Sequence, residues 1–206
     1  MNNYDDFIYM DDEALPEQTC EEITRFVKEH KQKFIQLSEK HTALEPQREK
    51  KKQDDMWFYV EWFNTFPNDY YDLLGEVIKK GVQEYIQKYS VIFEGVSLSS
   101  PKIKYHIVHP HGGYHAWHTE WAGSPVADSM LVWHLSLTNH KEEGELEFLY
   151  YGKRIEPKAG RLIIWPSYFT HTHKGNSIRT NTEKHYITGW WNKEENEYMR
   201  KEIENE

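Results

Sequence analysis

Two stretches in the first half of the chain carry hydrophobic residues at helical spacing. In residues 20–41 apolar positions recur every three or four residues with charged residues between them, which is the pattern of an amphipathic surface helix. A second stretch follows Pro67 and repeats this pattern over residues 68–85, where Asn68 or Asp69 can cap the first turn. The sequence therefore predicts two amphipathic helices in the N-terminal half.

The pattern changes to short strands after about residue 98. Alternating apolar and polar residues are interrupted there by Gly, Pro and charged turn residues, as in antiparallel sheets. The predicted strands are residues 102–108, 114–121, 130–138, 145–150, 161–165, 170–173 and 184–191. Short strands separated by turns predict an antiparallel barrel or jelly roll. The aromatic run at residues 56–66 fits a further strand but does not require one.

One domain accounts for the whole chain. Its 206 residues can bury a sizeable core, and neither a repeat nor a low-complexity segment marks a boundary. The expected fold is mainly β with N-terminal helices, about residues 1–97 forming the helical part and about residues 98–195 the β core. We expect the two amphipathic helices to cover that core and to bury Trp117 and Trp121.

Composition and charge narrow the classes of partner. The formal net charge is −9, and the only basic run is residues 48–52, so no nucleic-acid partner is expected. The single cysteine, Cys20, excludes an internal disulfide framework and favours a reducing compartment. Residues 1–16 hold no long apolar run, so we expect no signal peptide, no membrane anchor and a cytoplasmic location. The oligomeric state cannot be read from the sequence.

Histidines are concentrated in the second half of the chain. Of the 12 histidines, only His30 and His41 precede residue 106. The richest stretch ends in an H-x-E pair, His118 and Glu120. Because alternate residues of a strand share a face, this pair presents an imidazole and a carboxylate side by side. These are two of the three ligands in the 2-His-1-carboxylate set that binds non-haem Fe(II).

A third ligand has to come from elsewhere in the chain. The segment 165–173 offers His171 and His173, which share a face if it is a strand, so spacing does not separate them. His134, inside an apolar strand, fits a buried core histidine as well as one that faces the pocket. The other histidines of the rich stretch are expected in loops or in supporting positions, namely His106, His109, His111 and His115.

Five motifs follow one another between about residues 105 and 191: G-Y-H-x-W-H-x-E, EEGELEFLY, RIEPKAG, LIIWPSYFTHTHKGN and KHYITGWW. In this order and spacing they resemble the Fe(II)/2-oxoglutarate dioxygenases, in the prolyl-4-hydroxylase-like branch. The resemblance implies a double-stranded β-helix, or jelly roll, that binds Fe(II) and 2-oxoglutarate. It also implies an enzyme that uses O2 to hydroxylate a C–H bond of a peptidyl or amino-acid-like substrate, with decarboxylation of 2-oxoglutarate to succinate.

The resemblance assigns the metal ligands to His118, Glu120 and His171. The family's spacing from Pro166 to the distal histidine selects His171, and His173 then hydrogen-bonds a ligand or the substrate. The family more often has Asp where this chain has Glu120, whose side chain is one methylene longer.

The resemblance also implies a cation for the C5 carboxylate of 2-oxoglutarate. Lys184, at the start of the last predicted strand, matches the family's Arg/Lys position. The alternative, Arg179, falls in a polar stretch that is typical of a loop. Tyr114, on the face of His118, and Tyr105, on the preceding strand, are the candidates for a phenol that donates to the cosubstrate.

Two other functions remain open at this point. A 2-His-1-Glu set also suits a zinc hydrolase or a cupin-type enzyme on a jelly roll that does not use 2-oxoglutarate. Such an enzyme has no need of a buried cation at Lys184. A non-enzymatic jelly-roll binding module would instead use the aromatic residues as a platform for a sugar or a peptide. The fold alone does not identify the substrate.

Overall fold

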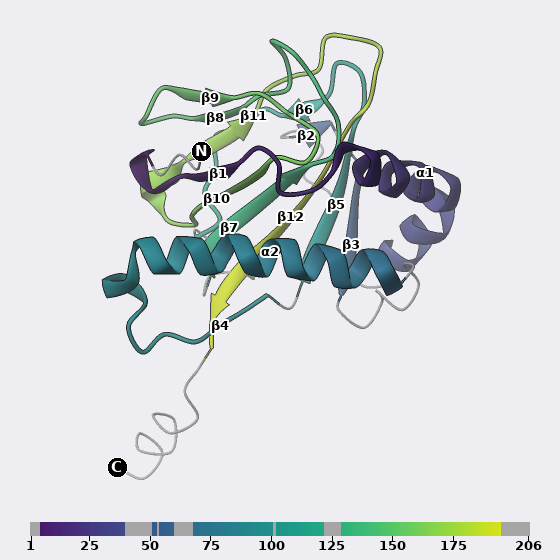
Figure 1. The fold of residues 1–206 in the computed structure, drawn as a ribbon. Coiled ribbons are helices and arrows are strands. Elements are labelled where there is room, and N and C mark those ends of the chain that lie inside the picture. The colour runs from purple at the N-terminus through teal and green to yellow at the C-terminus, as the bar shows by residue number, and fades with distance from the viewer. Residues whose placement is uncertain are drawn as a thin grey trace.

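A large antiparallel sheet forms the centre of the computed structural model, which describes residues 5–39, 51–52, 54–59, 68–100, 102–121 and 129–194. The sheet has seven strands in the order β1-β10-β7-β12-β5-β3, with β4 paired to β12 (Figure 1). The strands are β1 (Tyr9–Asp11), β3 (Asp54–Tyr59), β4 (Leu98–Ser99), β5 (Lys102–Val108), β7 (Ser129–Ser136), β10 (Leu162–Pro166) and β12 (Lys184–Lys193).

Two helices cover one face of this sheet, α1 (Glu17–Glu39) and α2 (Asn68–Lys88) (Figure 1). Their apolar stripes, including Ile23 of α1 and Ile78 of α2, share one core with alternate residues of the central strands such as Trp133 and Ile187. Burial of these stripes stabilises the helices on the sheet. Within the described residues, neither helix combines the length and the apolar composition that a bilayer span needs.

A smaller sheet covers the opposite face. Its order is β11-β8-β9, from β8 (Leu146–Phe148), β9 (Lys153–Ile155) and β11 (His173–Gly175). Inward residues of this sheet, such as Phe148, share a second core with Trp165 and Trp190 of the large sheet. A two-stranded ladder joins β2 (Lys51–Lys52) to β6 (Gly113–Tyr114). Three 3₁₀ turns complete the described elements: η1 (Asp5–Phe7), η3 (Ser90–Phe93) and η4 (Phe169–His171).

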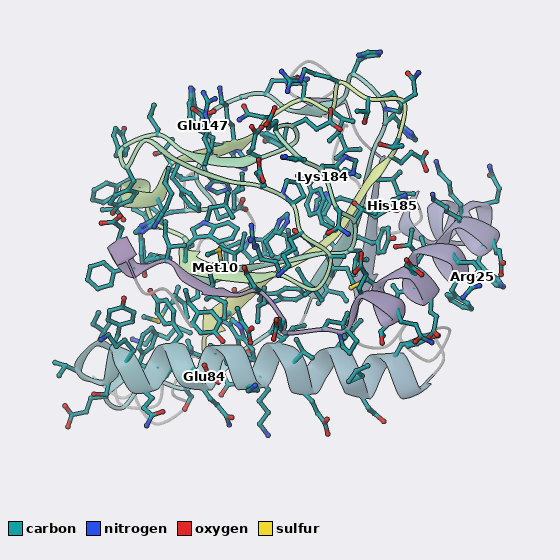
Figure 2. The ribbon with its side chains drawn as sticks, turned by 45° about the horizontal axis from the view of Figure 1, so that its top comes forward. Met10, Arg25, Glu84, Glu147, Lys184 and His185 are labelled. Atoms are coloured by element: carbon teal, nitrogen blue, oxygen red, sulfur yellow. The ribbon has the colours of Figure 1, made fainter. Side chains whose placement is uncertain are left out.

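Alternation along β12 separates the two faces. Lys184 and Trp190 point to the small sheet, whereas His185 and Ile187 point to the helices, as expected for a strand. The adjacent Lys184 and His185 are both labelled in Figure 2. The side of β12 that carries Lys184 therefore faces the space between the two sheets.

The predicted mainly β fold with two N-terminal helices and antiparallel sheets is confirmed. Two predicted strands are wrong. Residues 114–121 contribute only Tyr114 to a regular strand and otherwise form one isolated bridge, and residues 169–171 form the 3₁₀ turn η4. The expected burial of Trp117 and Trp121 is also wrong, since they are 38% and 47% exposed. The segment that carries them lies beside β11 of the small sheet, away from the helices.

The open question about the aromatic run at 56–66 is answered in part. Its first residues belong to β3, which pairs with β5 along the edge of the large sheet, and residues 60–67 lie outside the described residues. The N-terminal half therefore supplies β1 and β3 to the sheet as well as its helical cover.

Candidate metal and cosubstrate site

His118, Glu120 and His173 lie together at one end of the small sheet; we refer to them as the ligand cluster. One ligand atom from each residue lies within 4.8 Å of the other two. Glu120 Oε1 is 3.4 Å from His118 Nε2 and 3.8 Å from His173 Nε2. An antiparallel bridge with two backbone hydrogen bonds, of 3.0 and 2.9 Å, joins His118 to His173. This bridge brings together two segments that are far apart in the sequence.

Backbone carbonyl groups hold both imidazoles of the ligand cluster in one tautomer. His118 Nδ1 lies 3.0 Å from the carbonyl oxygen of Ala116, and His173 Nδ1 lies 2.9 Å from that of His171. A carbonyl oxygen only accepts hydrogen bonds, so Nδ1 carries a proton in each ring, and the lone pair of Nε2 is the one that is available to a metal. A metal ligand needs such a lone pair, and a hydrogen bond from the other ring nitrogen is the usual support for one.

Glu120 is oriented by an indole. Trp190 donates its Nε1–H to Glu120 Oε2 at 3.0 Å, which leaves Oε1 facing the imidazoles. Burial by itself raises the pKa of Glu120, but the hydrogen bond and charge of His118 and the charge of His173 outweigh burial and lower the pKa to about 2. Burial and the neighbouring His118 lower the pKa of His173 to about 3. At neutral pH the cluster thus offers an ionised carboxylate and a neutral imidazole at His173, which is a donor set for a divalent cation.

Of the two distal histidines, the structure brings His173, and not the predicted His171, into the ligand cluster. The His171 ring is buried away from the cluster, with Nε2 at 2.9 Å from the Asp6 carbonyl oxygen and Nδ1 at 2.9 Å from Thr170 Oγ1. The two histidines do not share a face, because the 3₁₀ turn η4 ends at His171 and β11 begins only at His173. The alternation of a strand therefore does not apply across this segment.

Lys184 places a cation between the two sheets. Its side chain is buried, the residue being 4% exposed, and Nζ donates to the Gly144 carbonyl at 2.6 Å and lies 4.8 Å from the centre of the Tyr186 ring. Among the described residues, Lys184 makes no ion pair with a carboxylate. Burial lowers its pKa to about 8, and the charge of Glu145 opposes this shift only in part. A buried cation of this kind is suited to pairing with an anionic group.

Two histidines enclose Tyr186 on the same face of the sheet. The ring centroids of His106 and His134 lie 4.2 Å and 4.5 Å from that of Tyr186, and both pairs are stacked. His106 Nε2 is 2.8 Å from Thr188 Oγ1, and His134 Nε2 is 3.1 Å from Ser136 Oγ. Burial, followed by the charge of Lys184, lowers the pKa of His134 well below its ordinary value. His134 therefore belongs to the side that faces the small sheet, the alternative that the sequence left open.

Tyr114 lies beside the ligand cluster. Its ring centroid is 4.0 Å from that of His118, although the continuous strand that was expected to put the two residues on one face does not form. Sequence reasoning missed the contact of Trp190 with Glu120 and the stacking around Tyr186. Strand alternation from Lys184 places Tyr186 and Trp190 on the side of β12 that faces the small sheet, so the sequence pattern could have identified them.

Two predicted cosubstrate residues lie elsewhere. Tyr105 points to the helices, where its hydroxyl lies 2.9 Å from His185 Nδ1 within the helix-side core. Arg179 is exposed, and its guanidinium donates to the carbonyl of Glu142. Neither residue reaches the space between the sheets. Tyr105 occupies an odd-numbered position of β5 that alternation assigns to the other face, and Arg179 belongs to a surface loop.

Comparisons with known proteins agree with this geometry. Residues 103–192 match the sequence pattern of the 2OG-Fe(II) oxygenase superfamily, and no curated protein sequence matches the chain.

Three solved structures illustrate the likeness of fold. The chain is similar to the viral collagen prolyl hydroxylase of Paramecium bursaria Chlorella virus-1 in its 2OG complex, with 15% identity, a TM-score of 0.61, and coverage of 91% of this chain and 96% of that one. It is similar to a Pseudomonas putida prolyl-4-hydroxylase, with 17% identity, a TM-score of 0.60, and coverage of 91% and 93%. A prolyl hydroxylase from Trichoplax adhaerens, in complex with a hypoxia inducible factor oxygen degradation domain peptide fragment, has 13% identity, a TM-score of 0.55, and coverage of 90% and 83%. At these identities the likeness is one of fold.

Proposed function

We propose that the chain hydroxylates a C–H bond of a peptidyl or amino-acid-like substrate with Fe(II), 2-oxoglutarate and O2, because residues 103–192 match the family model of the 2OG-Fe(II) oxygenase superfamily. In the proposed reaction 2-oxoglutarate is decarboxylated to succinate. The observation that carries the proposal is the combination of two imidazole Nε2 atoms and a carboxylate with a buried lysine, Lys184, whose ammonium forms no ion pair with a described carboxylate.

The finer fold that we propose is a double-stranded β-helix. Two antiparallel sheets face each other across a shared core, and the bridge between His118 and His173 places a further segment beside the small sheet. Likeness of fold to the viral and bacterial prolyl hydroxylases supports this assignment. The metal and cosubstrate then lie between the two sheets.

We assign the metal to His118, Glu120 and His173. The backbone carbonyls that fix both Nδ1–H groups and the indole that fixes Glu120 hold the three donor atoms in place, so little reorganisation is needed when the ion binds. Three protein ligands leave positions open for the cosubstrate and O2. When bound, Fe(II) and 2-oxoglutarate would supply electrons that activate O2, and O2 would be the oxidant for both the decarboxylation of 2-oxoglutarate and the C–H hydroxylation.

We assign the C5 carboxylate of 2-oxoglutarate to Lys184. A carboxylate beside this ammonium would neutralise a buried charge that contacts a carbonyl and a ring and that Glu145 offsets only in part. Lysine acts here as a point charge without the two-pronged geometry of arginine. Tyr114, next to His118, is the proposed phenol donor at the metal end of the cosubstrate.

In this proposal the substrate enters the site beside an exposed aromatic surface formed by Trp121 and Phe169. Trp121 directly follows Glu120 and packs edge-to-face on Phe169 with ring centroids 6.1 Å apart, and the two residues are 47% and 63% exposed. Exposed aromatic residues of this kind favour contact with a partner or substrate. The complex of the Trichoplax adhaerens enzyme with a peptide fragment supports a peptidyl substrate for the present chain.

A metal hydrolase or cupin-type enzyme that does not use 2-oxoglutarate has no cosubstrate carboxylate to pair with the buried ammonium of Lys184. Calorimetric titration of the Mn(II)-loaded protein with 2-oxoglutarate separates the two functions. We expect binding to the native chain, loss of binding in Lys184→Met, and retention in Lys184→Arg. A native protein that binds Mn(II) but not 2-oxoglutarate would overturn the proposal in favour of the hydrolase or cupin-type reading.

A further inference from the structure

The first described residues form a strap along the edge of the large sheet; we call residues 5–11 the N-terminal strap. It consists of the turn η1 and strand β1, which pairs with β10. Asp6 and Phe7 have φ angles of 57° and 59°, in the left-handed region that non-glycine residues rarely adopt. Such a conformation persists only when surrounding contacts hold it.

Contacts from three directions hold this turn. Tyr85 of α2 donates its hydroxyl to the Phe7 carbonyl at 3.1 Å, and the Phe7 ring lies 4.8 Å from that of Tyr89. Lys153 of β9 lies 4.0 Å from an Asp6 carboxylate oxygen. The third contact is the hydrogen bond to the Asp6 carbonyl from the His171 ring. The strap thus joins the helix layer to the loop that leads into β11.

Both ring nitrogens of His171 are occupied. The Asp6 carbonyl only accepts, so His171 Nε2 carries the proton and donates at 2.9 Å, and Nδ1 accepts from the Thr170 hydroxyl at 2.9 Å. The ring also lies 5.0 Å from that of Tyr151 and is buried. Protein groups therefore fix the His171 ring without a metal, and they restrain the main chain of His171 as well.

The main-chain carbonyl of the same residue orients a metal ligand, since it accepts the Nδ1–H of His173 at 2.9 Å. A chain of two hydrogen bonds therefore runs from the Asp6 carbonyl, through His171, to the His173 ring. We propose that the N-terminal strap, acting through His171, positions His173 for metal binding. This inference rests on the proposed function, because it takes His173 to be a metal ligand.

A matched pair of substitutions at Asp6 tests the strap at a distance from the ligand cluster. Asp6 is exposed, and both Asp6→Pro and Asp6→Gly remove its carboxylate from Lys153. Glycine adopts a positive φ freely, whereas proline is restricted to a φ of about −65° and cannot form the turn. The two variants therefore differ in whether the Asp6 carbonyl can still meet His171.

The measurement is the dissociation constant of Mn(II), taken from the electron paramagnetic resonance signal of the free ion, in the absence of 2-oxoglutarate. We expect Asp6→Pro to bind Mn(II) about tenfold to a hundredfold more weakly, as when a partner that supports a ligand is lost. Asp6→Gly should bind like the native chain. Equal affinities of Asp6→Pro and the native chain would overturn the inference.

If thermal unfolding shows that Asp6→Pro does not fold, a second pair of variants, at His171, tests the positioning role. His171→Gln keeps an amide N–H that can donate to the Asp6 carbonyl, and His171→Ala does not. We expect weaker Mn(II) binding in His171→Ala and recovery in His171→Gln, whereas equal binding by both variants contradicts a positioning role. If the native chain itself binds no Mn(II), the proposed metal site fails, a result that is distinct from failure of the strap alone.

Discussion

The Trp190 indole donates to one carboxylate oxygen of Glu120 at 3.0 Å and leaves the other oxygen turned toward His118 and His173. The two residues come from β12 and from the segment next to β11, so this contact links the two sheets across the site. Because Glu reaches one methylene further than Asp, its carboxylate needs an anchor of this kind to present a single oxygen to the metal.

Replacement of Trp190 by Phe should weaken metal binding. The substitution keeps the aromatic bulk and removes the N–H, so Glu120 can turn, and we expect Mn(II) affinity to fall about tenfold or more. The matched control is Trp191→Phe, because Trp191 Nε1 has no hydrogen-bond partner among the described residues. Mn(II) titration of both variants checks this, and equal affinities would show that the indole does not orient the carboxylate.

The substitution Glu120→Asp tests the contact between Trp190 and Glu120 by changing the carboxylate that accepts the hydrogen bond. The shorter side chain cannot reach both the indole and the imidazoles, so we expect a loss of Mn(II) affinity of about tenfold. Adding Trp190→Phe to Glu120→Asp should then cost little more, because the contact is already lost. A double variant whose loss is the sum of the two single losses would contradict this coupling.

The affinity for 2-oxoglutarate should depend on pH through Lys184. Burial lowers the pKa of this lysine to about 8, so the ammonium is present below that pH and is lost as the pH rises through it. The dissociation constant for 2-oxoglutarate should therefore increase above about pH 8, approaching tenfold for each further pH unit.

Lys184→Arg is the control for this pH dependence, because a guanidinium stays charged over the whole range. Calorimetric titrations of the Mn(II)-loaded proteins between about pH 7 and pH 9.5 provide the comparison. A native profile that is as flat as that of Lys184→Arg would remove Lys184 from the cosubstrate site.

Substitution by alanine should change the free energy of unfolding in opposite directions at Gly189 in β12 and at Gly75 in α2. A Cβ on Gly189 would lie 2.4 Å from atoms of the Trp133 indole, whereas a Cβ on Gly75 in α2 meets nothing within 4 Å. Gly189→Ala should lower the free energy of unfolding by about 1–3 kcal/mol through overpacking. Gly75→Ala should raise it by about 0.5–1 kcal/mol through helix propensity. Urea denaturation measures both, and a destabilised Gly75→Ala or an unchanged Gly189→Ala would contradict the packing described here.

Much of the fold follows from periodicity in the sequence. The stripes of α1 and α2 each define one buried face, and the alternation of β5, β7 and β12 separates the residues that face the helices from those that face the small sheet. The same alternation places Lys184 on the side that faces the small sheet, and it assigns Tyr105 to the helix side together with Ile103 and Ile107. Alternation along β5 therefore argues against a contact between Tyr105 and the cosubstrate.

The choice of the distal histidine could not be made from periodicity. Residues 169–171 form a 3₁₀ turn, and a turn of this kind breaks the period-2 rule that relates His171 to His173 on a strand. The exposure of Trp117 and Trp121 has a similar cause, because their segment makes a single bridge and no regular strand. Short elements such as β1 have too few residues to show a periodic pattern. The position of the N-terminal strap and its hydrogen bond to His171 are set by tertiary contacts and could not be predicted from the sequence.

The most direct test of the metal and cosubstrate site is an anaerobic titration of the protein and Fe(II) with 2-oxoglutarate, followed by the weak visible charge-transfer band of the chelate. The native chain should develop the band, His173→Ala should lose it, and His171→Ala should retain it at saturating Fe(II). Absence of the band from the native chain although iron binds would contradict the cosubstrate site. Loss of the band in His171→Ala with retention in His173→Ala would contradict the ligand assignment.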